Sequence, residues 1–208
     1  MNVYDFDETL FYGDSEDRFF QFIFRKKGYF FCKLNYKWNE FKLRRGWATK
    51  TETREAEYAP VLKRIAETED FDKLLEAYWD EVEQYMMPWY DGVKKPDDII
   101  ASGTPRFIME PIVRRLGLKN LVATEMDRVT GKCTGKFAVA EAKLVNFELQ
   151  YDCKDIDNFY SDAYSDHFIA DKAKKAWLIY EENGERKQME WNEYFRLHPE
   201  KAVIPYKR

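Results

Sequence analysis

The stretch VYDFDETL, from Val3 to Leu10, places two carboxylates two residues apart after a short apolar segment. In an extended chain, residues i and i+2 point to the same side. At the carboxyl end of a strand, Asp5 and Asp7 would enter the crevice in which open α/β sheets bind ligands. Carboxylates this close repel each other unless a cation or a shared proton compensates. One carboxylate could therefore act as a nucleophile and the other as a proton carrier, with a divalent metal between them.

The alternative interpretation of this stretch is structural. Asp7 and Thr9 are also residue types that cap the start of a helix, so the same letters fit a polar strand end followed by a helix. The choice between the two depends on the motifs farther along the chain.

The run DIIASGTP reads as a short apolar strand over 98–101 that leads to Ser102, after which Gly103 and Thr104 turn the chain. Pro105 suits the first turn of a following helix. A hydroxyl at a strand end, beside the backbone N–H groups of a helix start, is a good receptor for phosphate oxygens. The alternative is that one of these hydroxyls only caps the helix.

Two more candidate pieces lie downstream. Lys143 falls on the first turns of a helix predicted near 140–149, and a strand predicted over 156–160 runs into a loop with Asp162 and Asp166, four residues apart. Taken singly, the lysine reads as a solvated surface charge and the acids as an ordinary capping loop.

In this order, the motifs D-x-D-x-T, strand-Ser-Gly-Thr, Lys and S-D-x-x-x-D resemble those of the haloacid dehalogenase (HAD) superfamily, most closely its phosphoserine-phosphatase-like branch. The resemblance extends from residue 1 to about residue 172. It implies an α/β fold with a Rossmann-like (HAD-like) core and a parallel sheet, assigned to residues 1–13 and 91–208. An inserted α-helical cap, 14–90, would open to admit substrate and close to exclude bulk water.

The resemblance also implies a role for each matching residue. Asp5 would attack phosphorus to form an aspartyl-phosphate, and Asp7 would protonate the leaving oxygen. Ser102 would bind a phosphoryl oxygen and Lys143 would neutralise charge. The implied metal ion is Mg²⁺, and its ligands would come from Asp5, Asp7, Asp162 and Asp166. Further substrate contacts are predicted for Thr9, Gly103, Thr104, Phe19 and Phe22.

The function that the resemblance implies is a Mg²⁺-dependent phosphomonoester hydrolase, a phosphatase acting on a small phosphorylated metabolite. One alternative is a phosphotransferase or mutase that shares the aspartyl-phosphate. Another is a catalytically weak protein whose basic, aromatic cap binds lipid or a partner. The identity of the substrate stays open, because cap residues set that choice.

The segment 18–47 interleaves basic and aromatic residues to an unusual degree. One interpretation is an amphipathic lid lying against a membrane surface, which gives a peripheral membrane contact. A second is a cationic pocket lined by aromatic rings. We favour a third, in which the aromatic residues form the core of the cap, because aromatic residues at helical spacing are usually core. Phe19 and Phe22 are the expected exceptions, since they follow the catalytic loop.

Composition fits this picture. The net charge of −4 argues against a general nucleic-acid binder. Three cysteines without C-x-x-C spacing, no signal peptide and no long apolar run predict a cytoplasmic protein. The pair Asn183-Gly184 predicts a C-terminal hairpin over 176–191, from which no substrate is inferred. A short helix is predicted over 191–197.

Overall fold

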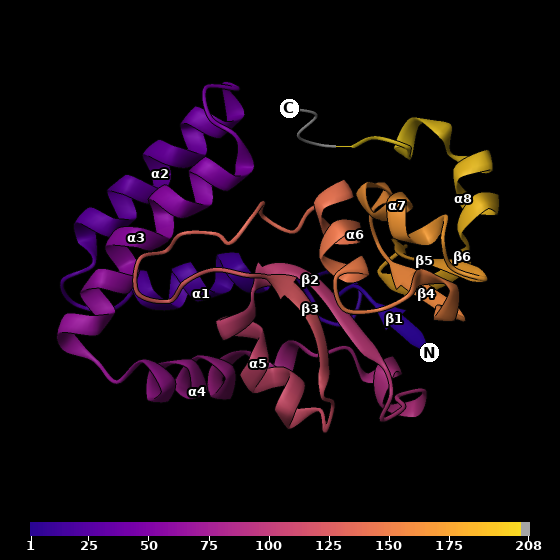
Figure 1. The fold of residues 1–208 in the computed structure, drawn as a ribbon, viewed down its shortest axis with the longest axis horizontal. Coiled ribbons are helices and arrows are strands. Elements are labelled where there is room, and N and C mark those ends of the chain that lie inside the picture. Colours follow the sequence, from indigo (N-terminus) through magenta and orange to yellow (C-terminus); the bar gives the residue numbers. More distant parts are fainter. Residues whose placement is uncertain (205–208) are drawn as a thin grey trace.

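The computed structural model describes residues 1–204, which fold around a six-stranded sheet with helices on both faces and a helical lobe at one end (Figure 1). The strand order is β3-β2-β1-β4-β5-β6, and only the β5–β6 pair is antiparallel. This topology confirms the predicted α/β core with a parallel sheet. The strands are β1 (Asn2–Tyr4), β2 (Ile99–Pro105), β3 (Asn120–Thr124), β4 (Asn158–Ser161), β5 (Lys175–Glu182) and β6 (Glu185–Glu190).

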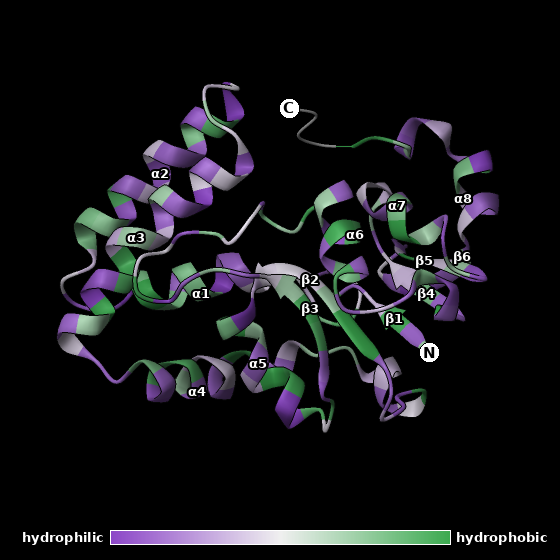
Figure 2. Ribbon diagram, viewed as in Figure 1, coloured by the Kyte–Doolittle hydropathy of each residue, from purple (hydrophilic) through white to green (hydrophobic). Residues whose placement is uncertain are grey.

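The central strands form because their residues are apolar on both sides, as expected for a parallel sheet that is covered on both faces (Figure 2). Alternate residues point to opposite faces. Tyr4 and Ile100 belong to the same hydrophobic cluster as helix α5 (Arg106–Arg115). Val3 and Ile99 face the other cluster. That second cluster is covered by α6 (Glu141–Glu148), α7 (His167–Ala170) and α8 (Trp191–Leu197).

Between β1 and β2 the chain forms four helices and two short 3₁₀ turns, in agreement with the predicted helical insertion. Asp14 and Asp70 cap α1 and α4 through their side chains, and Thr49 forms a capping box with Glu52 at the start of α3. The elements are α1 (Ser15–Phe24), α2 (Phe30–Arg44), α3 (Lys50–Thr68), α4 (Phe71–Val82), η1 (Glu83–Tyr85) and η2 (Pro88–Gly92).

The insertion shares its hydrophobic core with the sheet. Phe19, Tyr58 and Trp79 from the helices lie in one buried cluster with Phe6 and Phe107. The indole N–H of Trp79 also donates to the carbonyl of α5 residue Ile108 over 2.7 Å. Helices α1 and α4 therefore belong to the body of the molecule, while α2 and α3 project from it (Figure 1).

The loop over 125–140, between β3 and α6, crosses to the helical insertion and runs beside α3 (Figure 1). Lys132 pairs with Glu55 at 2.7 Å, and the N–H of Cys133 donates to the same carboxylate at 2.9 Å. The N–H of Phe137 donates to the hydroxyl of Thr51 over 3.0 Å. These contacts tie the insertion to the loop that follows β3. The loop also contains the hairpin predicted near 126–136 in a short form, because Met126 and Cys133 form an antiparallel bridge and the N–H of Asp127 donates to the carbonyl of Lys132 over 2.8 Å.

Two local predictions were wrong. Strand β2 does not turn at Gly103 and Thr104 but continues to Pro105, with a register shift against β3 that absorbs the irregularity. The helix predicted over 166–175 is shorter, because α7 ends at Ala170 and the chain re-enters the sheet as β5. The prediction of a C-terminal hairpin is confirmed. It forms β5 and β6 around Asn183 and Gly184, both at positive φ.

The aromatic residues of 18–47 divide between the core and the surface. Phe20 is buried, as we expected for a cap core, and Phe19 is buried too, although it was an expected exception. The expectation was wrong for α2 and the turn after it, where Phe31, Trp38 and Trp47 are exposed. Helix α2 has apolar side chains on two faces, and packing against α3 covers only one of them. Within residues 1–204, no helix is both long enough and apolar enough to cross a bilayer.

Candidate active site

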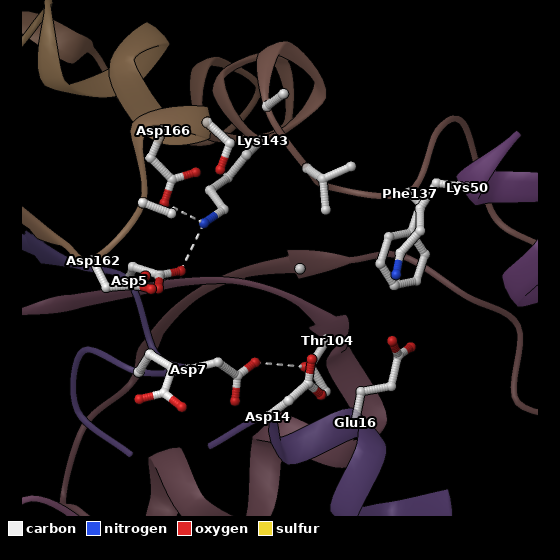
Figure 3. Close-up of a pocket in the computed structure, with 16 residues that line it drawn as sticks. Asp5, Asp7, Asp14, Glu16, Lys50, Thr104, Phe137, Lys143, Asp162 and Asp166 are labelled. Carbon is white, nitrogen blue, oxygen red and sulfur yellow. Dashed lines mark hydrogen bonds and ion pairs between the residues drawn. The ribbon is translucent and has the colours of Figure 1, made fainter. Parts of the chain in front are cut away.

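A cavity of about 290 Å³ opens where β1, β2 and β4 end, at the carboxyl edge of the parallel sheet (Figure 3). This is the edge at which open α/β sheets bind ligands. The cavity brings together most of the predicted site residues. They are Asp5, Asp7, Gly103, Thr104, Lys143, Asp162 and Asp166.

Asp5 is fixed in place from both its backbone and its side chain. Its N–H donates to the carbonyl of Tyr160 over 2.8 Å, which extends the β1–β4 pairing by one residue. One carboxylate oxygen accepts from Lys143 at 2.7 Å and the other from the hydroxyl of Thr9 at 3.3 Å. Burial raises the pKa of Asp5 to about 6, while Lys143 opposes the rise. Thr9 is fully buried and does not line the cavity, so its hydroxyl can position Asp5 but cannot contact a substrate.

Lys143 is a buried cation between two buried carboxylates. Its ammonium contacts Asp5 and Asp166, each at 2.7 Å, and the Asp166 oxygen also accepts from Ser161 at 2.8 Å. Burial alone would lower the pKa of Lys143, but Asp166 and Asp5 raise it above its ordinary value. The lysine is therefore charged at neutral pH. It reaches the site from α6, which starts after Ala140, a residue at positive φ.

Asp7 sits at the junction of the sheet and the helical insertion. One of its oxygens accepts from the N–H of Ser15, the first residue of α1, over 2.7 Å. The other accepts from the Thr104 hydroxyl over 3.2 Å, and the two hydroxyls of Ser15 and Thr104 are 3.1 Å apart. Burial, followed by the charges of Asp14 and Asp5, raises the pKa of Asp7 well above its ordinary value. A carboxyl of this kind can carry a proton at neutral pH.

Besides Thr9, three more of the predicted substrate-contact residues do not line the cavity. Ser102 is almost fully buried and does not line the cavity, and its hydroxyl accepts from the N–H of Thr104 over 3.1 Å. Phe19 packs edge-to-face on Tyr78, and Phe22 does the same from the next turn of α1. Neither ring faces the cavity, contrary to our expectation, because both lie on the side of α1 that packs on α4.

The donor set at this edge suits a hard divalent cation. Burial, together with Asp5 and Asp166, raises the pKa of Asp162 well above its ordinary value, which marks an excess of negative charge. Mg²⁺ is bound through one or two carboxylates plus water and substrate phosphate. Within residues 1–204, no three His, Cys, Asp or Glu side chains form a cage by themselves. A Mg²⁺ ion at Asp5 and Asp162 would therefore complete its shell with backbone carbonyls, water or phosphate.

The sequence interpretation missed four residues on the far side of the cavity, namely Asp14, Glu16, Lys50 and Phe137 (Figure 3). Asp14 and Glu16 flank the first turn of α1, Lys50 begins α3, and Phe137 comes from the loop that runs beside α3. No sequence motif joins them, since three separate segments meet only in the folded chain.

Glu16 is held by a buried charge network. Arg54 contacts Glu16 and Glu40 at 2.7 Å and Glu57 at 2.5 Å, and the hydroxyl of Tyr58 donates to Glu16 over 3.0 Å. Burial raises the pKa of Glu16 and raises the pKa of Glu57 to about 7, so Arg54 and protonation together neutralise the acids of this network. Lys50 adds a positive charge to the same wall.

The C-terminal hairpin also reaches the site. Glu8 lies in the cavity wall at a φ of 57°, and its carboxylate pairs with Arg186 on β6. A non-glycine residue at positive φ persists when its surroundings hold it there. Through this contact the hairpin helps to hold the loop that connects β1 to helix α1, the loop that carries Asp5 and Asp7.

Comparisons with known proteins identify the family and the fold. The family model for haloacid dehalogenase-like hydrolases matches residues 3–171. A protein of unknown function from Bordetella pertussis Tohama I has a similar fold, with a TM-score of 0.72, 18% identity, and coverage of 96% of this chain and 95% of that one. No curated protein matches the sequence.

Two other solved structures share the fold over part of their length. A HAD-family hydrolase from Salmonella enterica serovar Typhi has a TM-score of 0.57 and 16% identity, covering 82% of this chain and 58% of that one. A probable phosphoserine phosphatase from Vibrio cholerae has a TM-score of 0.55 and 13% identity, and the match covers 84% of this chain and 55% of that one. At these identities the likeness concerns the fold.

Proposed function

This chain belongs to the haloacid dehalogenase-like hydrolase family, and from that membership and the site geometry we propose that it is a Mg²⁺-dependent phosphatase of small phosphomonoesters. The observation that carries the proposal is the buried Asp5–Lys143–Asp166 arrangement beside a separately held Asp7. A true dehalogenase needs no acid at the position of Asp7. An acid/base there favours phosphate chemistry.

In the first step, a carboxylate oxygen of Asp5 attacks phosphorus in line with the ester bond. The Asp5 O–P bond forms while the bond from phosphorus to the ester oxygen breaks. Asp7 gives its proton to the leaving oxygen, so the product departs as a neutral alcohol. The raised pKa of Asp7 supports this role, because the carboxyl must be protonated when the substrate binds.

In the second step, Asp7 takes a proton from water, and the resulting hydroxide attacks phosphorus. Inorganic phosphate leaves and the Asp5 carboxylate is restored. Lys143 balances negative charge on Asp5 and on the phosphoryl group throughout. Mg²⁺, when bound by Asp5 and Asp162, would supply further charge neutralisation to the phosphoryl oxygens. Thr104 holds Asp7 in position through its hydroxyl.

The size and charge of the cavity support a small substrate. The cavity volume is about 290 Å³, and the wall opposite Asp5 and Asp166 carries Asp14, Glu16 and Lys50. This wall offers both acidic and basic side chains to the charged groups of a small phosphoester.

The test is release of inorganic phosphate from an aryl phosphate, measured with Mg²⁺ and with chelator. Turnover should require Mg²⁺ and should be lost in Asp5→Asn, while the exposed Asp171→Asn serves as the matched control and keeps native turnover. A phosphotransferase would instead release the aryl alcohol only when an acceptor alcohol is added, and the phosphoryl group would be found on that acceptor and not as inorganic phosphate. Equal turnover by native protein and Asp5→Asn would exclude the aspartyl-phosphate route.

A further inference from the structure

One face of α2 carries large apolar side chains that no part of residues 1–204 covers. The helix packs through Cys32, Asn39 and Leu43, which are buried. On its other side the apolar residues recur at helical spacing, and the turn to α3 adds one more. We call these residues the α2 aromatic face. Their exposed fractions are 66% for Phe30, 80% for Phe31, 48% for Leu34, 56% for Trp38, 39% for Phe41 and 66% for Trp47.

The rings of this face are arranged against one another. Trp38 stacks on Phe41 with ring centroids 5.6 Å apart, and Phe41 meets Trp47 edge-to-face at the same distance. The guanidinium of Arg45 lies 5.2 Å from the centre of the Phe41 ring. The face is therefore a connected apolar surface, whereas exposed apolar residues scattered singly would need no explanation.

Positive charge surrounds the same helix. The segment 25–47 contains eight Lys and Arg and one acidic residue, Glu40. Glu40 is turned inward, where it pairs with Arg54 at 2.7 Å. The whole chain has 34 basic and 38 acidic residues, so 26 basic and 37 acidic residues remain for the rest of it. The segment 25–47 is therefore basic, whereas the rest of the chain is acidic. The cations in and after α2 are Lys33, Lys37, Lys42, Arg44 and Arg45.

We propose that the α2 aromatic face docks the cap onto an anionic lipid surface. Helices that lie in a membrane interface combine Trp, Phe and Leu with flanking Lys and Arg, and both groups are present here. At 15 residues, α2 is about 22 Å long and would lie along the surface. Its place on the outside of the helical lobe leaves it free to do so (Figure 1).

Other occupants fit this surface less well. A second copy seated on the same face would bring two sets of cations together, which is unfavourable. Single-stranded nucleic acid binds along positively charged grooves. Here the rings lie on the outward ridge of a helix with the cations beside them. Charge complementarity and shape together favour a lipid headgroup layer with the rings below it.

Docking would take place next to the catalytic cavity. Trp47 precedes Lys50 by three residues, so their Cα atoms lie within about 11 Å of each other. Lys50 lines the cavity. The α3 end of the cavity would therefore lie close to the lipid surface.

The test is flotation of the full chain with vesicles of phosphatidylcholine alone or with about 30% phosphatidylglycerol, at low salt and at about 0.5 M NaCl. We expect binding to the anionic vesicles only, weakened at least about tenfold by salt. Trp38→Ser with Phe41→Ser should weaken binding at least about tenfold. The matched control is Val129→Ser with Leu149→Ser, two residues that are more exposed than Trp38 and Phe41 but lie outside α2, and this variant should bind as the native chain does.

A charge test is independent of the rings. Each basic residue near an anionic surface contributes a factor of about five, so Lys37→Glu, Arg44→Glu and Arg45→Glu together should reduce binding about a hundredfold or more. The exposed Lys119, Lys154 and Lys172, reversed in the same way, give the matched control.

Three results would overturn the proposal. They are no binding of the native chain to anionic vesicles at low salt, equal binding by α2 variants and their controls, and a lipid-free dimer that Trp38→Ser with Phe41→Ser dissociates. The last result would make the face a contact between copies. Asp5→Asn should bind vesicles like the native chain, so loss of catalysis and loss of docking are told apart.

Discussion

Removing the positive charge of Lys143 should destabilise the protein in a pH-dependent way. In Lys143→Met the apolar side chain fills a similar volume, but Asp5 and Asp166 face each other without a cation. All three side chains are buried, with exposed fractions of 6%, 10% and 3% for Lys143, Asp5 and Asp166. Solvent screening reduces the stabilisation by surface ion pairs to almost nothing, but it is small at this buried site.

The magnitude follows from that burial. Breaking a buried ion pair by removing one partner costs about 3–5 kcal/mol, because a charge is left uncompensated. Here two carboxylates lose the same partner, so we expect the upper part of that range at pH 7. Burial raises the pKa of Asp5 to about 6, so protonation of Asp5 relieves part of the penalty, and the stability deficit of Lys143→Met relative to the native chain should shrink as the pH falls toward 5.

The assay is urea unfolding of metal-free protein at pH 5 and pH 7, for native protein, Lys143→Met, Asp166→Asn and the double variant. Because the two sites are in contact, the double variant should lose less than the sum of the single losses. Phosphate release should also fall about 10²–10³-fold in Lys143→Met. A variant as stable as the native chain at both pH values would refute the reasoning that Lys143 neutralises buried carboxylates.

Three further predictions concern the acids, the hydroxyl at Asp7 and the loop beside α3. In metal-free protein the folded pKa of Asp5 is about 6 against an ordinary 3.8, so the folded state binds more protons and stability should fall as the pH rises from about 4 through 6. Thermal unfolding in chelator should show this slope, at most about 1.4 kcal/mol per pH unit, and Asp5→Asn should flatten it. Thr104→Val removes the donor to Asp7 and should lower kcat about tenfold or more with little change in KM, a result that an unchanged kcat would contradict. Gly131→Ala should cost about 2–4 kcal/mol, because φ is 72° and the new Cβ would lie 2.8 Å from the backbone of Ala59. Gly135→Ala shares the positive φ but meets open space, so chemical denaturation should show a smaller loss of about 1 kcal/mol.

The succession of strands and helices along the chain, the parallel sheet and most of the acid site were predictable from sequence. Short motifs at strand ends carry that information, since parallel strands deliver their carboxyl ends to one edge. Asp5, Asp7 and Asp162 follow strand ends and reach the cavity for this reason, whereas Lys143 comes from α6. The Asn183-Gly184 turn was predictable because φ > 0 at two successive residues favours these two residue types.

Tertiary structure alone decided the rest. Periodicity showed that α2 has apolar residues, but not which of its apolar faces α3 would cover, because burial depends on the partner and not on the helix. The far wall of the cavity, built from α1, α3 and the loop at Phe137, joins segments that are up to about 120 residues apart. Local sequence encodes backbone geometry and side-chain chemistry, whereas the meeting of distant segments follows from how the whole core packs.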